Sequence, residues 1–199
     1  MNKKAQTINT YNRSALLLAD KFDSLGARVS DIEETLAILN KPEPNILEIG
    51  CGNGRDAEEI LKHTNNYLGI DVSEKLIDLA KKKVSKGRFE IADIETYPIP
   101  NNLDVIFAFA SLIHVPKESL QKILNLAFKS LNSGGVFFMS MKHADGYVES
   151  TKEDEFGTRT YYLYSIEDIK EIAKSFIILK NKIHDLRGQK WFEIILQKP

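Results

Sequence analysis

The sequence contains a single cysteine, Cys51, among 199 residues, so the chain cannot form an internal disulfide. A single thiol fits a protein of the reducing cytoplasm, where we expect this one to act. No apolar run is long enough to cross a membrane, and no apolar stretch follows the basic start as it would in a secretory signal. The formal net charge is only −1, which argues against a dedicated nucleic-acid binder. We expect neither a membrane nor DNA as a partner, while RNA stays open.

Repeats and low-complexity tracts are also absent, and the length suits one domain. Apolar runs at 46–49, 67–70, 88–92, 103–108 and 136–141 alternate with segments of helical spacing. This alternation predicts an α/β fold with a mostly parallel sheet covered by helices on both faces. The last two runs, 176–183 and 190–196, have no helix between them and therefore predict an antiparallel hairpin. In such a fold the ligand lies at the carboxyl ends of the first strands.

A glycine-rich loop joins the first predicted strand to a helix, with the pattern Gly50-x-Gly52-x-Gly54. Glycines allow a sharp turn and let a ligand approach the main chain. Dinucleotide-binding enzymes use G-x-G-x-x-G, but here Arg55 takes the place of the third glycine. Glu48 precedes the loop, where a carboxylate would repel a pyrophosphate and attract an ammonium group. A tight turn that binds nothing is the alternative.

Two aspartates follow the next two predicted strands. Asp71 can accept two hydrogen bonds from a ribose diol, or it can simply favour the dipole of the following helix. Asp93 can accept the exocyclic amine of adenine, while Ile94 offers an apolar face and a backbone N–H. A turn-forming aspartate is the alternative for Asp93.

Taken in order, these stretches resemble successive motifs of the class I S-adenosylmethionine-dependent methyltransferases. They are Glu48-x-Gly-x-Gly-x-Gly54, Gly69-Ile-Asp71-Val-Ser, Ala92-Asp93-Ile, Leu103-Asp-Val-Ile-Phe107 and Leu131-Asn-Ser-Gly-Gly-Val-Phe137. The similarity covers about Ile46 to Met141. It implies a three-layer, doubly wound, seven-stranded sheet of order 3-2-1-4-5-7-6 with strand 7 antiparallel, which agrees with the predicted hairpin.

The resemblance also implies S-adenosyl-L-methionine as cofactor and S-adenosyl-L-homocysteine as product. The cofactor-binding residues that it implies are Tyr11, Glu48, Gly50, Cys51, Gly52, Gly54, Asp71, Val72, Asp93, Ile94, Ala108 and Phe109. Glu48 and the glycine loop would hold the methionine moiety, Asp71 the ribose, and Asp93 with Ile94 the adenine. The backbone near Ala108 to Ala110 would line the sulfonium. Tyr11 would close over the methionine end, or simply pack in an amphipathic helix.

On the acceptor side, methyl transfer by direct displacement needs alignment more than it needs a base. His114 is the candidate catalytic residue, in a stretch that resembles one facing the acceptor in relatives; a helix-start histidine bonded to backbone is the alternative. His143, Arg159 and Tyr162 are the candidate substrate contacts. Arg159 could pair with an anionic substrate, or with Glu153 or Asp154 by default. We expect no metal.

We expect a single domain over 1–199 with four segments. They are an N-terminal helical cap (1–41), a cofactor-binding core (45–141), a substrate-side insert (142–165) and a C-terminal helix with the hairpin (166–199). In the cap, Ser30 and Glu33 predict a capping box at the start of the second helix. The expected acceptor is a small molecule; a tRNA or protein acceptor, or a non-catalytic regulatory protein, are the alternatives. A monomer or a homodimer is expected.

Overall fold

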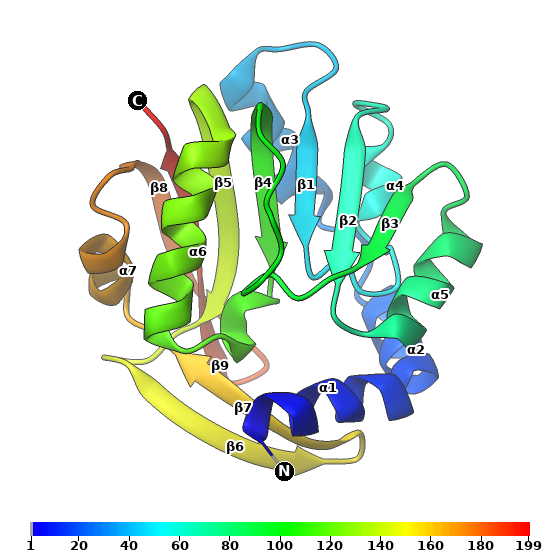
Figure 1. Cartoon of the computed structure of the whole chain (residues 1–199). Helices are drawn as coiled ribbons and strands as arrows, with labels where there is room; N and C mark the ends of the chain where they lie inside the picture. Colours follow the sequence, from blue (N-terminus) through cyan, green and yellow to red (C-terminus); the bar gives the residue numbers. More distant parts are fainter. Residues whose placement is uncertain (1) are drawn as a thin grey trace.

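The computed structural model describes residues 2–199 and contains the predicted sheet. Its seven strands lie in the order β3-β2-β1-β4-β5-β9-β8 (Figure 1). Their bounds are β1 Ile46–Ile49, β2 Tyr67–Asp71, β3 Arg88–Ile91, β4 Leu103–Phe109, β5 Leu131–Lys142, β8 Ile177–Leu186 and β9 Gln189–Gln197. The first five pair in parallel, and β9 lies antiparallel to both β5 and β8. The predicted fold class and strand order are confirmed.

Helices cover both faces of the sheet because each presents one apolar face to it. The helices α3 (Val29–Leu39), α4 (Ala57–Ile60) and α5 (Glu74–Lys83) contribute to one core cluster. The helices α6 (Lys117–Ser130) and α7 (Ile166–Ile172) contribute to the cluster on the other face (Figure 1). Ser73 and Ser165 cap α5 and α7 with their side chains, as their positions before apolar runs suggest.

The N-terminal cap differs from the prediction in two places. The part of the cap that precedes the predicted second helix forms two helices instead of one, α1 (Lys3–Arg13) and α2 (Ala15–Ser24). They meet at Ser14, whose hydroxyl donates to the carbonyl of Phe156 at 2.7 Å. The predicted capping box is wrong, because α3 begins at Val29 and places Ser30 inside its first turn. Arg28 precedes the helix instead, and its backbone N–H donates to the Asp56 carboxylate at 2.8 Å. A tertiary contact, not a local one, therefore fixes this helix start.

The substrate-side insert forms a hairpin of its own, outside the main sheet. Its strands β6 (Val148–Asp154) and β7 (Gly157–Leu163) pair antiparallel and lie beside α1 below the sheet (Figure 1). The contact with α1 is polar as well as apolar: the Thr10 hydroxyl donates to the carbonyl of Thr158 at 2.7 Å. The backbone N–H of Thr160 donates to the hydroxyl of Thr7 at 3.0 Å. Helix α1 and the hairpin thus form a joint cover at the carboxyl ends of the parallel strands.

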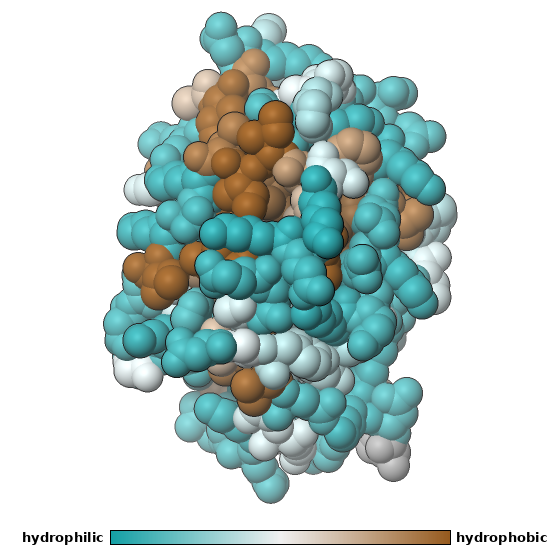
Figure 2. Space-filling view, turned by 90° about the vertical axis from the view of Figure 1, so that its left-hand side faces the viewer, coloured by the Kyte–Doolittle hydropathy of each residue, from teal (hydrophilic) through white to brown (hydrophobic). Residues whose placement is uncertain are grey.

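The far edge of the sheet is exposed. Figure 2 shows the side of the molecule that lies at left in Figure 1, where apolar residues gather within a mostly polar surface. The edge strand β8 carries four exposed apolar residues: Ile177, Leu179, Ile183 and Leu186. Within residues 2–199, no helix is both long enough and apolar enough to span a bilayer.

Candidate active site

A cavity of about 600 Å³ lies between the carboxyl ends of the parallel strands and the cover formed by α1 and the β6–β7 hairpin. This volume falls in the range of small-molecule sites. Most of the predicted site residues line it: Tyr11, Gly50, Cys51, Gly52, Asp71, Val72, Asp93, Ile94, Phe109, His114 and Arg159. The others do not belong to its lining: Glu48, Gly54, Ala108, His143 and Tyr162. The cavity therefore has a glycine-loop end and an end formed by the cover.

The glycine loop is held tightly against the segment that follows β4. Gly50 has a φ of +74°, and a Cβ placed on it would lie 2.2 Å from Cβ of Ser111. The Ser111 hydroxyl donates to the carbonyl of Ile49 at 2.5 Å, which fixes this close approach. Gly54 serves packing instead, because a Cβ there would contact Ala80 of α5 at 3.3 Å. Of the three loop glycines, Gly50 and Gly52 line the cavity and Gly54 does not.

Asp71 ends β2 with its carboxylate in the cavity wall. Its Oδ2 accepts the backbone N–H of Gly52 at 3.0 Å, and its Oδ1 accepts that of Ser73 at 2.8 Å. Burial raises the pKa of this carboxyl, while the backbone donors lower it. A carboxylate has about four lone-pair sites, so two acceptor sites stay available for a diol. The alternative role at the helix dipole is compatible with the same geometry, since α5 begins at Glu74.

Glu48 lies behind the glycine loop and is only 1% exposed. The Tyr67 hydroxyl donates to its Oε2 at 2.5 Å. Burial, followed by the charge of Asp56, raises the pKa of Glu48 to about 8. A direct contact of Glu48 with a ligand ammonium group stays a prediction, because Gly50 and Cys51 lie in the cavity wall and Glu48 does not.

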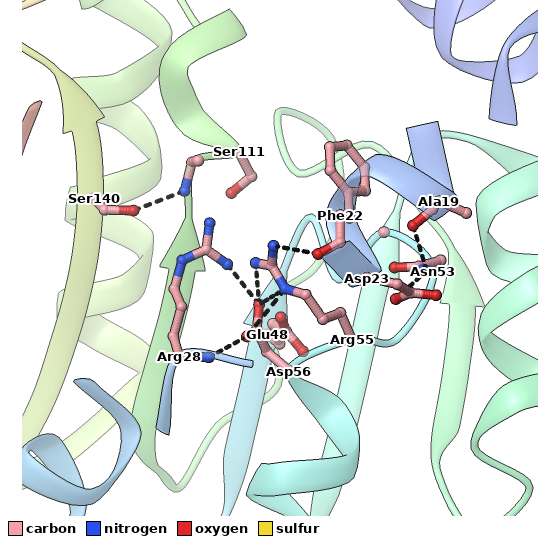
Figure 3. Close-up of polar contacts among 12 residues, drawn as sticks. Ala19, Phe22, Asp23, Arg28, Glu48, Asn53, Arg55, Asp56, Ser111 and Ser140 are labelled. Carbon is pink, nitrogen blue, oxygen red and sulfur yellow. Dashed lines mark hydrogen bonds and ion pairs between the residues drawn. The ribbon is translucent and has the colours of Figure 1, made fainter. Parts of the chain in front are cut away.

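Two arginines that the sequence analysis did not single out as site residues converge beside the loop (Figure 3). The guanidinium groups of Arg28 and Arg55 donate to Oδ2 of the buried Asp56 at 2.6 and 2.7 Å. Arg55 also donates to the carbonyl of Phe22 at 3.3 Å, which ties α2 to the loop. Arg28 lies over the ring of Phe109 at 5.0 Å and lines the cavity. No local pattern marks Arg28, because its partners come from other elements.

At the opposite corner, Asp93 lies beneath the first turn of α1. Its Oδ2 forms an ion pair with Nζ of Lys4 at 2.6 Å, and Glu95 accepts from the same amine at 2.6 Å. The carboxylate of Asp93 also accepts the backbone N–H of Glu95 at 3.1 Å. Asp93 therefore has the turn-forming contact and still lines the cavity. Ile94 is buried beside it.

The segment after β4 enters the cavity with its backbone. Ala108 is fully buried within the sheet, whereas Phe109 and Ala110 line the cavity. Ala110 has a φ of +52°, an uncommon conformation for a residue with a Cβ. Its N–H donates to the hydroxyl of Ser140 at 3.0 Å (Figure 3). This paired N–H stabilises the strained turn that leads to His114.

Tyr11 and His114 form a pair at the cover. The Tyr11 hydroxyl lies 2.8 Å from Nε2 of His114, and Nδ1 of His114 lies 2.6 Å from the carbonyl of Thr160. A carbonyl only accepts, so we assign the ring proton to Nδ1, and Nε2 accepts from Tyr11. Burial lowers the pKa of His114 to about 4 and raises that of Tyr11. His114 is therefore neutral and engaged at both nitrogens, and Tyr11 points toward His114.

Three further side chains complete this end of the cavity. Arg159 pairs with Asp154, the default alternative weighed above, and its guanidinium lies 5.6 Å from the ring centre of Tyr161. Nζ of Lys142 lies 3.5 Å from the centre of the same ring. Burial and the charges of Lys152 and Arg159 lower the pKa of Lys142 to about 8. Lys142 and Tyr161 both line the cavity and were not predicted as site residues.

His143 and Tyr162 lie outside this group. The His143 ring packs edge-on against Phe192 at 6.2 Å, and the Tyr162 ring stacks on Tyr147 at 6.1 Å. Because side chains alternate along β7, Tyr162 faces away from the cavity that its neighbour Tyr161 lines. Residues 2–199 contain no cluster of side chains suited to a metal ion.

The chain is similar to several known proteins. A family model described as "Methyltransferase domain" matches residues 46–135. A malonyl-[acyl-carrier protein] O-methyltransferase of Ilyobacter polytropus is 29% identical over 177 residues, which cover 86% of this chain and 61% of that protein. A trans-aconitate 2-methyltransferase of Variovorax paradoxus is 31% identical over 118 residues, 57% of this chain and 45% of that protein. The chain thus spans about half to three-fifths of the length of these relatives.

Solved structures share the fold. The 1,6-didemethyltoxoflavin-N1-methyltransferase of Burkholderia thailandensis, with bound 1,6-didemethyltoxoflavin and S-adenosylhomocysteine, has a TM-score of 0.78 at 18% identity, over 98% of this chain and 88% of that chain. An S-adenosylmethionine-dependent methyltransferase of Clostridium acetobutylicum has a TM-score of 0.69 at 17% identity, over 84% and 88%.

Strand order, glycine loop and the acidic end of β2 define an α/β protein of the nucleoside-binding type. The order of the motifs along the chain narrows the class of protein further than the fold alone does. Residues 46–135 match the methyltransferase-domain family model, and the chain shares the fold of solved S-adenosylmethionine-dependent methyltransferases.

Proposed function

We propose that this protein is an S-adenosylmethionine-dependent methyltransferase that acts on a small-molecule acceptor. One observation carries the proposal. The cavity joins the Gly50–Gly52 main chain and the Asp71 carboxylate at one end to the Tyr11–His114 pair at the other. Such a cavity can hold an adenosyl amino acid and bring a second molecule against it.

The residues present fit the cofactor. Asp71 keeps acceptor sites for a ribose diol, and no side chain fills the space above Gly52, where a Cβ would meet nothing closer than Phe22 at 3.9 Å. Asp93 and Ile94 lie further along the same wall and suit the adenine. Arg28 adds a cation beside the loop that suits the carboxylate of the methionine moiety.

The cofactor supplies an electrophilic methyl group bonded to a positively charged sulfur. The leaving group is the neutral thioether. The chain's own residues therefore have to orient the acceptor and exclude water. Tyr11 stands in the cavity with its hydroxyl proton directed at His114, so its oxygen can accept one further hydrogen bond. His114 acts as a positioning residue in this scheme, because both its nitrogens are engaged and its pKa is too low for an effective base at neutral pH.

A small molecule is the proposed acceptor because the cover closes over the cavity. Helix α1 and the β6–β7 hairpin are joined by hydrogen bonds at Thr7 and Thr10, which limits access for a folded macromolecule. One relative reported above is named for a small acid, trans-aconitate. The experiments below distinguish this proposal from the alternatives, which are a tRNA or protein acceptor and a non-catalytic binding protein.

Calorimetric titration of the full chain with S-adenosylhomocysteine tests the cofactor, with NAD⁺ as the comparison ligand. We expect saturable binding of S-adenosylhomocysteine and none of NAD⁺. Binding of NAD⁺ alone, or of neither, would reject the proposed function. Formation of S-adenosylhomocysteine from S-adenosylmethionine with a panel of small acceptors, and not with bulk tRNA, tests the acceptor class. Binding without turnover on any acceptor would favour the regulatory alternative.

A further inference from the structure

The end of the cavity formed by the cover, here called the acceptor end, contains two cations, Arg159 and Lys142, of which only Arg159 has a carboxylate partner among residues 2–199. Arg159 is 7% exposed and pairs with Asp154 through Nη2. Its Nε is buried and has no hydrogen-bond partner among residues 2–199. A buried guanidinium N–H without a partner is costly, and such groups are normally satisfied by protein, water or a ligand. Arg159 itself lines the cavity.

Lys142 is the second cation. Over the described residues its ammonium group makes no ion pair, and Nζ lies 3.5 Å from the ring centre of Tyr161 and 5.9 Å from that of Trp191. The guanidinium of Arg159 lies 5.6 Å from the centre of the same Tyr161 ring, so this tyrosine lies next to both cations. The pKa of Lys142 is lowered to about 8 by burial and by neighbouring positive charges. The site is thus electropositive even though the whole chain carries a net charge of −1.

Neither His114 nor Tyr11 is suited to act as a base in this corner. His114 lies 4.9 Å from Tyr161, ring centre to ring centre, and is held neutral between Tyr11 and a backbone carbonyl. Burial raises the pKa of Tyr11, so its hydroxyl stays protonated. An acceptor that arrives with a proton on its nucleophile would depend on Lys142 to remove it, and only in the molecules in which that amine is uncharged. An acceptor that is already ionised at neutral pH needs none.

Resting on the proposed function, we infer that the acceptor is a carboxylic acid whose ionised carboxylate is bound by Lys142 and Arg159 and is itself methylated. A carboxylate has enough lone pairs to accept from both cations and to keep one for the reaction. In the reaction a carboxylate oxygen forms the new bond to the methyl carbon. The bond between that carbon and sulfur breaks, and its electron pair stays on sulfur. The products are a methyl ester and S-adenosylhomocysteine, and no proton is transferred.

Calorimetry on the full chain saturated with S-adenosylhomocysteine tests the binding step. The probes are sodium acetate, malonate, succinate and benzoate, and the four corresponding amides are the neutral controls. We expect at least one acid to bind and its amide to bind at least tenfold more weakly. Acids that bind no better than their amides, or no acid binding to a chain that binds S-adenosylhomocysteine, would overturn the inference. A chain that fails to bind S-adenosylhomocysteine would reject the proposed function first.

Variants assign the effect to the two cations. We expect Lys142→Met and Arg159→Gln each to weaken acid binding at least tenfold and to leave S-adenosylhomocysteine affinity within twofold. Lys122→Met is the matched control, since Lys122 is an exposed lysine on α6 outside the cavity lining. If Arg159→Gln fails to fold, the acid affinity of Lys142→Met by itself tests the inference. Unchanged acid binding in Lys142→Met would overturn the inference.

Turnover with methyl-labelled S-adenosylmethionine tests the reaction. We expect label in a product from which mild base releases methanol, because esters hydrolyse and methyl ethers and amines do not. A base-stable methylated product would overturn the assignment of the carboxylate as nucleophile.

Discussion

The two ends of the cavity are built in different ways. At the glycine-loop end, here called the donor end, the backbone N–H of Gly52 donates to the side-chain carboxylate of Asp71, 19 positions further along the chain, and the family model covers this part. At the acceptor end, Tyr11 meets His114 across 103 positions, and β6–β7 lies beyond the matched residues. The donor end consists mainly of main-chain atoms, whose positions are fixed by the neighbouring strands β1 and β2. The acceptor end consists of side chains brought together by the cover formed by α1 and the β6–β7 hairpin.

The largest effect is expected from Gly50→Ala at the donor end. The new Cβ would lie 2.2 Å from Cβ of Ser111, and a φ of +74° strains any side chain. We expect S-adenosylhomocysteine binding to be lost and the free energy of unfolding to fall by more than about 2 kcal/mol. Gly134→Ala is the matched control, because its φ is +77° and nothing lies within 4 Å of its Cβ. Equal losses in both variants would show that backbone strain alone, not the close approach, is responsible.

Asp71→Ala is next. Loss of charge-assisted hydrogen bonds should weaken S-adenosylhomocysteine binding by about 1–3 kcal/mol, measured by calorimetry. Asp20→Ala, at an exposed aspartate of α2, is the control and should change nothing. Unchanged affinity in Asp71→Ala would remove this residue from the ribose site and leave only its role at the helix dipole.

At the acceptor end, Tyr11→Phe should separate the two functions. Loss of the Tyr11 hydroxyl leaves Nε2 of His114 without a hydrogen-bond donor. We therefore expect kcat to fall roughly tenfold, which corresponds to one hydrogen bond of about 1.4 kcal/mol. Affinity for S-adenosylhomocysteine should stay within twofold. Tyr147→Phe, at a tyrosine outside the cavity lining, serves as control. A parallel loss of cofactor affinity would instead support the lid role over the methionine end.

The pH profile tests the charge of Lys142. Its pKa of about 8 is set by burial and by the groups that face it, namely Lys21, Lys152, Asp154, Arg159 and Tyr161. The amine loses its proton as pH rises through that value, so kcat/KM for an acid should decline severalfold above about pH 8. Lys142→Arg should remove the decline, because a guanidinium keeps its charge. A decline that persists in this variant would show that another group titrates.

The smallest effect concerns stability at the donor end. The pKa of Glu48 is raised from 4.5 to about 8 in the folded chain, so the folded state binds this proton more tightly than the unfolded state does. Stability should therefore fall as pH rises through that window. Glu48→Gln mimics the protonated form and should melt a few degrees higher than the wild type at pH 8, with the difference vanishing near pH 5. A constant difference at both values of pH would point to packing.

Most of the fold could be predicted, because strand–helix alternation and turn residues are local signals. The sheet order and the antiparallel hairpin agree with the structure. The errors lie where a distant contact overrides a local one. Asp56 binds Arg28 and moves the start of α3 away from the predicted capping box. The insert at 142–165 carries no clear period, yet it pairs as a hairpin once α1 lies beside it.

The sequence by itself determined the donor end. A glycine with positive φ and an aspartate at the end of the neighbouring strand are placed by their own backbone, so their spacing in the chain is enough to indicate them. Only the tertiary structure decided the acceptor end. There, the protonation of His114, the ion pair of Arg159 and the unpaired charge of Lys142 depend on which side chains the packing of α1 against β7 brings together. Long-range packing has no signature in a single sequence, because each partner alone has an ordinary local role.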